Sequence, residues 1–247
     1  MTDGPSGLLP LPHGYTNRTA GDGTVVVNRT AGDGTVVVKR YQGPDAEERR
    51  QREHRLLTLL HGLLPVPPVL GTEPGAVTLG HLPGVPAQDL LDAGHGAQVL
   101  AACGRLLRRI QAVDPSVTGD VPAPPGSVLV HGDFGPNNLL LDPATFAVTG
   151  LLDWEFAHPG KPVEDLAWCE WIVRTHHPAR AGDLHHLFDA YGQPVPPWPR
   201  RRAAMFAQCA RLEDFCRRRD PDGPGVRQWQ ERGRLTAGWP EQPGPLS

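Results

Sequence analysis

Several features that would assign this chain to a well-defined class are absent from it. The four cysteines of the 247-residue sequence show no Cys-x-x-Cys spacing, which favours reduced, buried thiols over a disulfide framework or a zinc site. Its 24 basic and 27 acidic residues give a formal net charge of −3, so nothing indicates a nucleic-acid partner. No apolar run approaches membrane-spanning length, and residues 1–12 lack the basic and apolar segments of a secretion leader. We therefore expect a cytoplasmic protein with no membrane partner.

A perfect tandem repeat occupies the N-terminal region, where Asn17 to Val27 recurs as Asn28 to Val38. Two copies are too few for a solenoid. Each copy joins a Gly-Asp-Gly turn to a β-branched run, which is typical of a β-hairpin. We interpret the repeat as a recent duplication absorbed as a meander, with Thr24 to Ala31 forming the strand between two turns. Lys39 is expected to keep its place, and the first copy is expected to be the displaced one, either bulging outward or lengthening the hairpin.

Hydrophobic periodicity and turn residues divide the rest of the chain. Asp45 as N-cap with Glu48 three residues later predicts a capping box that opens a helix ending near His61. Strands are predicted at 69–70 and 76–79, and helices at 97–113, 162–175, 179–191 and 200–219. We expect an N-terminal lobe at 1–80, a hinge at 81–86, a helical lobe at 87–220 and a poorly ordered tail at 221–247. By themselves these patterns indicate only a mixed α and β fold.

The most informative motif is the run His-Gly-Asp-Phe-Gly-Pro-Asn-Asn at 131–138, followed by Asp-Trp-Glu at 153–155. Short apolar runs flank both segments and predict buried strands, so the polar residues lie in a loop and at a strand end. Asp and Asn also form ordinary turns, but this spacing favours chemistry. Phosphoryl transfer requires an Asp that accepts the acceptor hydroxyl's proton, and an Asn and a second Asp that hold magnesium ions. Asp133, Asn138 and Asp153 supply that set.

These residues resemble the motif of the aminoglycoside phosphotransferase and choline kinase-like family of small-molecule kinases. That motif is His-Gly-Asp, four residues, Asn, then Asp-Trp or Asp-Phe and an acidic residue, and this chain matches every defining position. The resemblance as a whole extends from about Gly14 to about Trp171. The resemblance implies an α+β, protein kinase-like two-lobed fold, with a small antiparallel-sheet N-lobe and a helical C-lobe. It also implies that ATP and Mg²⁺ are used to phosphorylate a hydroxyl of an antibiotic or metabolite.

The resemblance gives nucleotide-binding roles to four N-terminal residues. Lys39 follows three valines on a predicted buried strand and is similar to the lysine that holds the α- and β-phosphates. Glu53 is similar to the helix glutamate that pairs with this lysine. Glu47 and Glu48 are the other candidates for this pairing, but their place in the first turn of the helix suits capping better. Gly14 and Asn17 belong to a segment that resembles the nucleotide loop, although the duplication lengthens its distance from Lys39.

Supporting roles follow from the same resemblance. The five-residue offset from the catalytic aspartate selects Asn138 rather than Asn137 as a metal ligand. His131 is expected to brace the loop by hydrogen bonding, and Glu155 to support the neighbouring metal-binding aspartate. Asp165 is similar to the family's acidic residue that opens the next helix, where it bonds backbone amides, so we expect a structural role.

Acceptor specificity is expected in the helical region that follows the second motif. Residues 160–247 contain 11 acidic and 13 basic residues, whereas a pocket for a polycationic aminoglycoside would be richer in carboxylates. The acceptor-site candidates are Glu170, Trp171 and His176, together with Trp168, and packing within a helix is the alternative for the two tryptophans. An alternative function for the whole chain is a catalytically weakened kinase-like binding protein, in which the duplicated hairpin spoils nucleotide binding.

Overall fold

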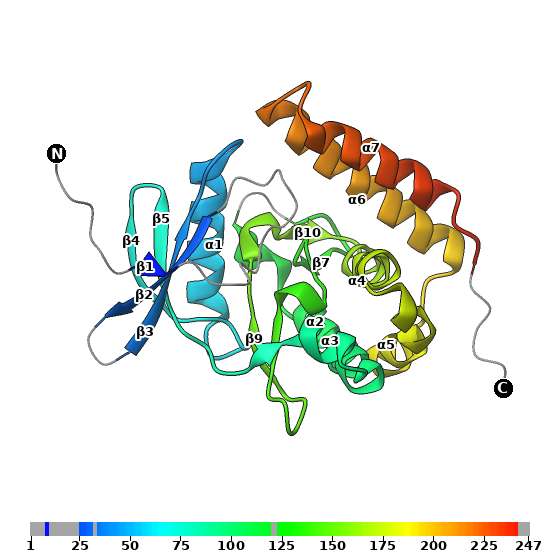
Figure 1. The fold of residues 1–247 in the computed structure, drawn as a ribbon, viewed down its shortest axis with the longest axis horizontal. Helices are drawn as coiled ribbons and strands as arrows, with labels where there is room; N and C mark the ends of the chain where they lie inside the picture. Colours follow the sequence, from blue (N-terminus) through cyan, green and yellow to red (C-terminus); the bar gives the residue numbers. More distant parts are fainter. Residues whose placement is uncertain (1–7, 10–24, 32–33, 120–122, 242–247) are drawn as a thin grey trace.

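The computed structural model describes residues 8–9, 25–31, 34–119 and 123–241 and shows a small sheet-rich lobe beside a larger helical lobe (Figure 1). The sheet of the small lobe is antiparallel, with strand order β1-β2-β3-β5-β4. Helix α1 lies between this sheet and the helical lobe (Figure 1). The elements are β1 (Leu8–Leu9), β2 (Val25–Ala31), β3 (Gly34–Arg40), α1 (Ala46–Leu60), β4 (Val69–Glu73) and β5 (Ala76–Gly80). The two-lobed α+β prediction is confirmed.

Strand β2 contains residues from both copies of the repeat. It pairs with β3 along its whole length, from Val25 opposite Arg40 to Ala31 opposite Gly34. The predicted strand is therefore confirmed, and the three valines of the first copy lengthen the hairpin, which is one of the two expected forms of displacement. Lys39 keeps its place, since β3 also pairs with β5. The rest of the first copy lies outside the described residues.

Helix α1 has the predicted length but not the predicted cap. Asp45 precedes its first residue in the left-handed region, with φ of 53°, and makes no side-chain hydrogen bond to the helix. Its carboxylate instead accepts a hydrogen bond from Arg218 at 2.6 Å. The capping box with Glu48 is therefore wrong: an N-cap residue normally has an extended backbone, whereas Asp45 is left-handed and its carboxylate points to Arg218.

The helical lobe contains two small sheets that support the loops between them. β6, which ends the predicted hinge segment at 81–86, pairs with β8, and β8 pairs with β9. β7 pairs with β10. The strands are β6 (Val85–Pro86), β7 (Val128–Val130), β8 (Leu139–Leu141), β9 (Val148–Leu151) and β10 (His158–Gly160). The α-helices are α2 (Ala87–Asp92), α3 (Gly96–Gln111), α4 (Val163–His176), α5 (Leu184–Tyr191), α6 (Trp198–Arg219) and α7 (Pro224–Ala237).

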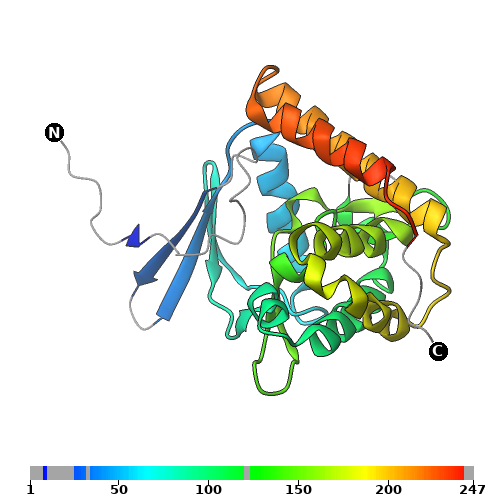
Figure 2. The ribbon, with the colours of Figure 1, turned by 45° about the vertical axis from the view of Figure 1, so that its right-hand side comes forward.

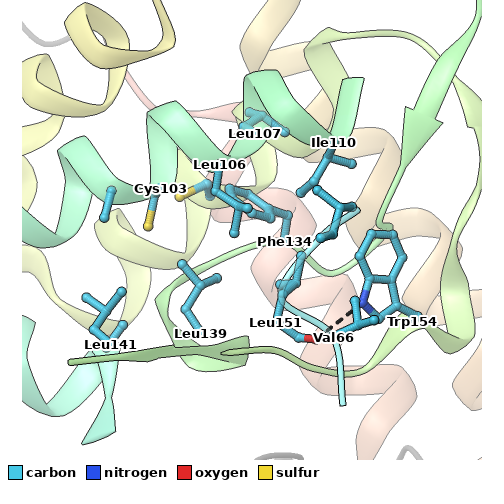
Figure 3. Packing of buried hydrophobic residues seen from close by; sticks show 14 of the residues in the cluster. Val66, Cys103, Leu106, Leu107, Ile110, Phe134, Leu139, Leu141, Leu151 and Trp154 are labelled. Atoms are coloured by element: carbon cyan, nitrogen blue, oxygen red, sulfur yellow. Dashed lines mark hydrogen bonds between the residues drawn. The ribbon is translucent and has the colours of Figure 1, made fainter. Parts of the chain in front are cut away.

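The main core forms where the apolar face of α3 meets the strands that flank the sequence motifs (Figure 3). Leu106 and Ile110 of α3 are fully buried, as is Phe134 of the motif loop. Leu151, which ends β9, and Trp154 in the turn that follows are also fully buried. Burial of a large apolar side chain contributes roughly 1.5–3 kcal/mol. The loop residues that follow Phe134 are therefore held against a rigid interior.

The predicted poorly ordered tail at 221–247 is wrong for most of its length, because α7 packs along α6 at the edge of the helical lobe (Figure 2). Pro224 stands at the first turn of the helix, where proline is favoured rather than disruptive. Val226 and Trp229 are buried against apolar residues of α4 and α6. Across the described residues, the helices are too short or too polar to cross a membrane.

Candidate active site

The loop between β7 and β8 holds its two polar motif residues in fixed positions. A short 3₁₀ turn at Pro136–Asn138 ends the loop, and the backbone oxygen of Asn138 accepts a hydrogen bond from Leu152 N at 2.9 Å. Gly132 has a φ of 86°, and a Cβ atom there would lie 2.5 Å from the oxygen of Phe156. Only glycine fits this close approach. The loop is thus positioned directly against the segment that carries the second motif.

Asp133 accepts a hydrogen bond on each carboxylate oxygen. Trp168 Nε1 donates to Oδ1 at 2.8 Å, and Asn138 Nδ2 donates to Oδ2 at 2.8 Å. Burial raises the pKa of Asp133 to about 6, although these two bonds oppose the rise. A carboxylate whose pKa lies near neutrality is well suited to accept a proton in a reaction near pH 7.

Two oxygens of the metal-ligand candidates are buried and have no hydrogen-bond partner among the described residues: Asn138 Oδ1 and Asp153 Oδ2. Buried polar atoms are normally satisfied, so an unpaired pair at predicted ligand positions needs an explanation. Carboxylate and amide oxygens are suitable ligands for Mg²⁺. The residues present therefore fit a magnesium site.

Lys39 lies in the centre of a buried charge network. Its Nζ atom is 2.6 Å from Glu53 Oε2, 2.8 Å from Asp153 Oδ1 and 3.5 Å from Glu155 Oε1. These carboxylates raise the pKa of Lys39, although burial opposes them, so the ammonium stays charged. The structure thus brings the predicted lysine and glutamate together and adds Asp153 to the pair.

The sequence did not indicate two residues of this network. Tyr41 donates its hydroxyl to Glu53 Oε2 at 2.6 Å, and Arg49 pairs with Glu155 across the boundary between α1 and the second motif. Arg49 also donates to the backbone oxygen of Pro44 at 3.0 Å. Helical spacing places Arg49 one turn before Glu53, but no local pattern indicates that its partner lies 106 residues away.

His131 and Asp165 brace the catalytic loop from two sides. His131 Nδ1 accepts from the Asp133 amide at 3.3 Å, so its Nε2 carries the proton donated to Leu152 O at 2.8 Å. Burial lowers the pKa of His131 to about 3. Asp165 on α4 accepts the amides of His131 and Gly132 at 2.7 and 3.0 Å. It bonds backbone amides, as expected, but those of the catalytic loop rather than those of its own helix.

The acceptor-site candidates occupy different environments. Glu170 is fully buried and accepts hydrogen bonds from Arg174 and Arg201. Trp171 is also buried and donates its indole N–H to Thr236. His176 is exposed beside the ring of Trp171. The nucleotide-loop candidates, Gly14 and Asn17, lie outside the described residues.

The fold and this set of side chains define a kinase-like phosphotransferase. A model of the phosphotransferase enzyme family matches residues 8–123 and 118–205. The chain therefore belongs to this family, and it is a small-molecule kinase. None of the curated protein sequences matches it.

Solved structures share the fold at low sequence identity. The apoenzyme of macrolide 2′-phosphotransferase MphH from Brachybacterium faecium is 20% identical, with a TM-score of 0.62, covering 91% of this chain and 92% of that one. A ternary complex of a thermostable mutant of aminoglycoside phosphotransferase APH(4)-Ia with ADP and hygromycin B is 18% identical, with a TM-score of 0.63 and coverages of 94% and 93%. The GDP complex of an aminoglycoside 2′-phosphotransferase-IIIa mutant is 12% identical, with a TM-score of 0.69 and coverages of 94% and 91%.

Proposed function

We propose that this protein transfers the γ-phosphoryl group of ATP to a hydroxyl of a small molecule, with Asp133 as the base. The observation that carries the proposal is the hydrogen bond from Asn138 Nδ2 to Asp133 Oδ2. The side-chain oxygen of Asn138, like Asp153 Oδ2, has no partner among the described residues. One side chain thus touches both the proton acceptor and the proposed metal site. In phosphoryl transfer these two groups must act on the same reacting centre.

The chain's own residues perform the remaining steps. Asp133 accepts the proton of the acceptor hydroxyl as its oxygen attacks the γ-phosphorus and the bond to the ADP oxygen breaks. Lys39, aligned by Glu53, supplies positive charge for the α- and β-phosphates of the nucleotide. Asn138 and Asp153 would hold Mg²⁺, which neutralises charge on the phosphates when it is bound.

The acceptor is proposed to be neutral or only weakly cationic. The acidic side chains of α4 that could attract a cation are already paired: Glu170 with Arg174 and Arg201, and Glu164 with Arg211. An aminoglycoside would find few free carboxylates on this helix. A panel of hydroxylated acceptors with γ-labelled ATP tests this class, and selective labelling of polycationic aminoglycosides would contradict it.

The test of the reaction uses Asp133→Asn, which keeps the size of the side chain. We expect the variant to fold and to bind Mg·ATP as the parent does, while kcat falls by two or more orders of magnitude, the approximate scale of base and positioning effects. Transfer to the acceptor identified in the panel is measured as labelled product. Parent-like turnover would show that Asp133 is not the base.

A further inference from the structure

The proposed function does not account for the hydrogen bond that Trp168 donates to Asp133. Trp168 lies on α4, and its Nε1 atom is 2.8 Å from Asp133 Oδ1. An indole N–H can donate a hydrogen bond but cannot accept one. It therefore restrains the carboxylate without competing for the proton that Asp133 receives. Asn138 restrains the other oxygen in the same way.

Two residues on one face of helix α4 hydrogen-bond to the catalytic loop. Asp165 accepts the amides of His131 and Gly132, which fixes the backbone of the loop. Trp168 follows three residues later, and residues at this spacing are neighbours on a helix surface. One rigid element therefore sets both the position of the loop and the rotation of the Asp133 carboxylate.

The Trp168 ring is itself held in place by other aromatic side chains. It stacks on Trp171, with ring centroids 4.4 Å apart and an interplanar angle of 7°. Trp229 of α7 packs against both rings, at 6.1 and 5.7 Å. Trp171 is tied to α7 by its 2.8 Å hydrogen bond to Thr236. Helix α7 thus supports the ring whose N–H reaches the base.

We propose that Trp168 is a positioning residue for phosphoryl transfer, which fixes the Asp133 carboxylate so that its remaining lone pairs meet the acceptor hydroxyl. The proposal rests on the proposed function, because it requires Asp133 to be the base. A small misplacement of a reacting group can cost about 100-fold in rate.

The contact itself is tested without any acceptor, by ¹⁵N–¹H correlation spectra of the six tryptophan indoles. Trp168→Phe assigns the Trp168 signal by its disappearance. We expect Asp133→Asn to move this signal, because the variant removes the charge that the N–H contacts. An unmoved Trp168 signal in Asp133→Asn would refute the contact and the proposal with it.

The role is tested by turnover of Trp168→Phe, with Trp229→Phe as the packing control, since Trp229 belongs to the same cluster but makes no contact with Asp133. We expect kcat to fall about 10- to 100-fold in Trp168→Phe, with unchanged KM for ATP, and less than about threefold in Trp229→Phe. A benzothienylalanine at position 168 replaces only the N–H by sulfur and should reproduce the loss. An equal fall in Trp229→Phe, or full activity of either Trp168 variant, overturns the proposal.

A double-variant cycle separates this inference from the proposed function. If Trp168 acts through Asp133, Trp168→Phe should have no further effect in the Asp133→Asn background, because interacting residues are not additive. An undiminished effect in that background overturns the positioning role. If Asp133→Asn alone retains parent-like turnover, the proposed function fails instead.

Discussion

Glu170→Gln distinguishes a structural role from an acceptor-binding role for the most deeply buried carboxylate of α4. Glu170 is fully buried, and its two oxygens are 2.7 Å from Arg174 and 2.7 Å from Arg201. The guanidinium groups also lie over the ring of Trp198, at 4.8 and 5.5 Å. The variant keeps the shape of the side chain but leaves two nearly buried cations without their shared counter-ion.

Removal of one partner from a buried ion pair costs about 3–5 kcal/mol. In a protein of this size each kcal/mol lowers the melting temperature by about 2–4 °C, so we expect a fall of roughly 6–20 °C. Differential scanning fluorimetry without nucleotide measures it. The control is Glu231→Gln, which removes an exposed pair with Arg234 and should cost at most about 1 kcal/mol.

An acceptor-binding role for Glu170 predicts the opposite pattern. The melting temperature of Glu170→Gln would then differ from that of Glu231→Gln by no more than about 2 °C. A difference of that size corresponds to the loss of one exposed ion pair. The KM for the acceptor would rise instead, because the ligand would lose a direct partner. That combination would refute the structural reading.

Two further predictions concern the nucleotide and the repeat. Asp153→Ala should abolish the magnesium dependence of ATP binding and Asn138→Ala should weaken it, because each removes an oxygen that is now unpartnered; unchanged magnesium-linked affinity in calorimetry would show that the metal site is misassigned. Deletion of residues 17–27 restores a single copy of the repeat, so the protein should fold and bind ATP at least as tightly as the parent, although the deletion also removes three paired valines of β2. Unfolding or loss of ATP binding after this deletion would show that the repeat is integral to the N-lobe.

Local patterns predicted the parts of the fold that depend on neighbours in sequence. The apolar stripe of α3 predicted its buried face, since Leu106, Leu107 and Ile110 recur at helical spacing. The cap of α1 could not be predicted in this way. Asp45 has the residue type and spacing of a capping residue, but Arg218 binds its carboxylate from 173 residues away. The local pattern indicates neither this distant contact nor the left-handed backbone at Asp45.

The same limit applies inside the site. Residue type and spacing identified Asp133 and Asn138, because their loop is bounded by strands close in sequence. Trp168 was a candidate for the acceptor pocket, but neither property indicated its contact with Asp133. Nor did either indicate Arg49, whose partner lies in the second motif. Glu170 was a reasonable polar candidate until the fold placed Arg201 against it from a separate helix. Charged residues of a helix can be assigned only when their partners are known.

The duplication is compatible with an intact site because of where it falls in the chain. All of the inserted residues precede Lys39, and the contacts of Lys39 with Glu53 and Asp153 are made by residues that follow it or belong to its own strand. The register of β2 on β3 is set by the second copy, whose residues lie on both sides of the turn. Three valines of the first copy then continue this register opposite Val38, Lys39 and Arg40. An odd insertion of eleven residues would reverse the faces of a strand if it fell within the paired segment. Here the second copy alone sets the register from Asn28 to Ala31 and the first copy only continues it, so Lys39 keeps its face.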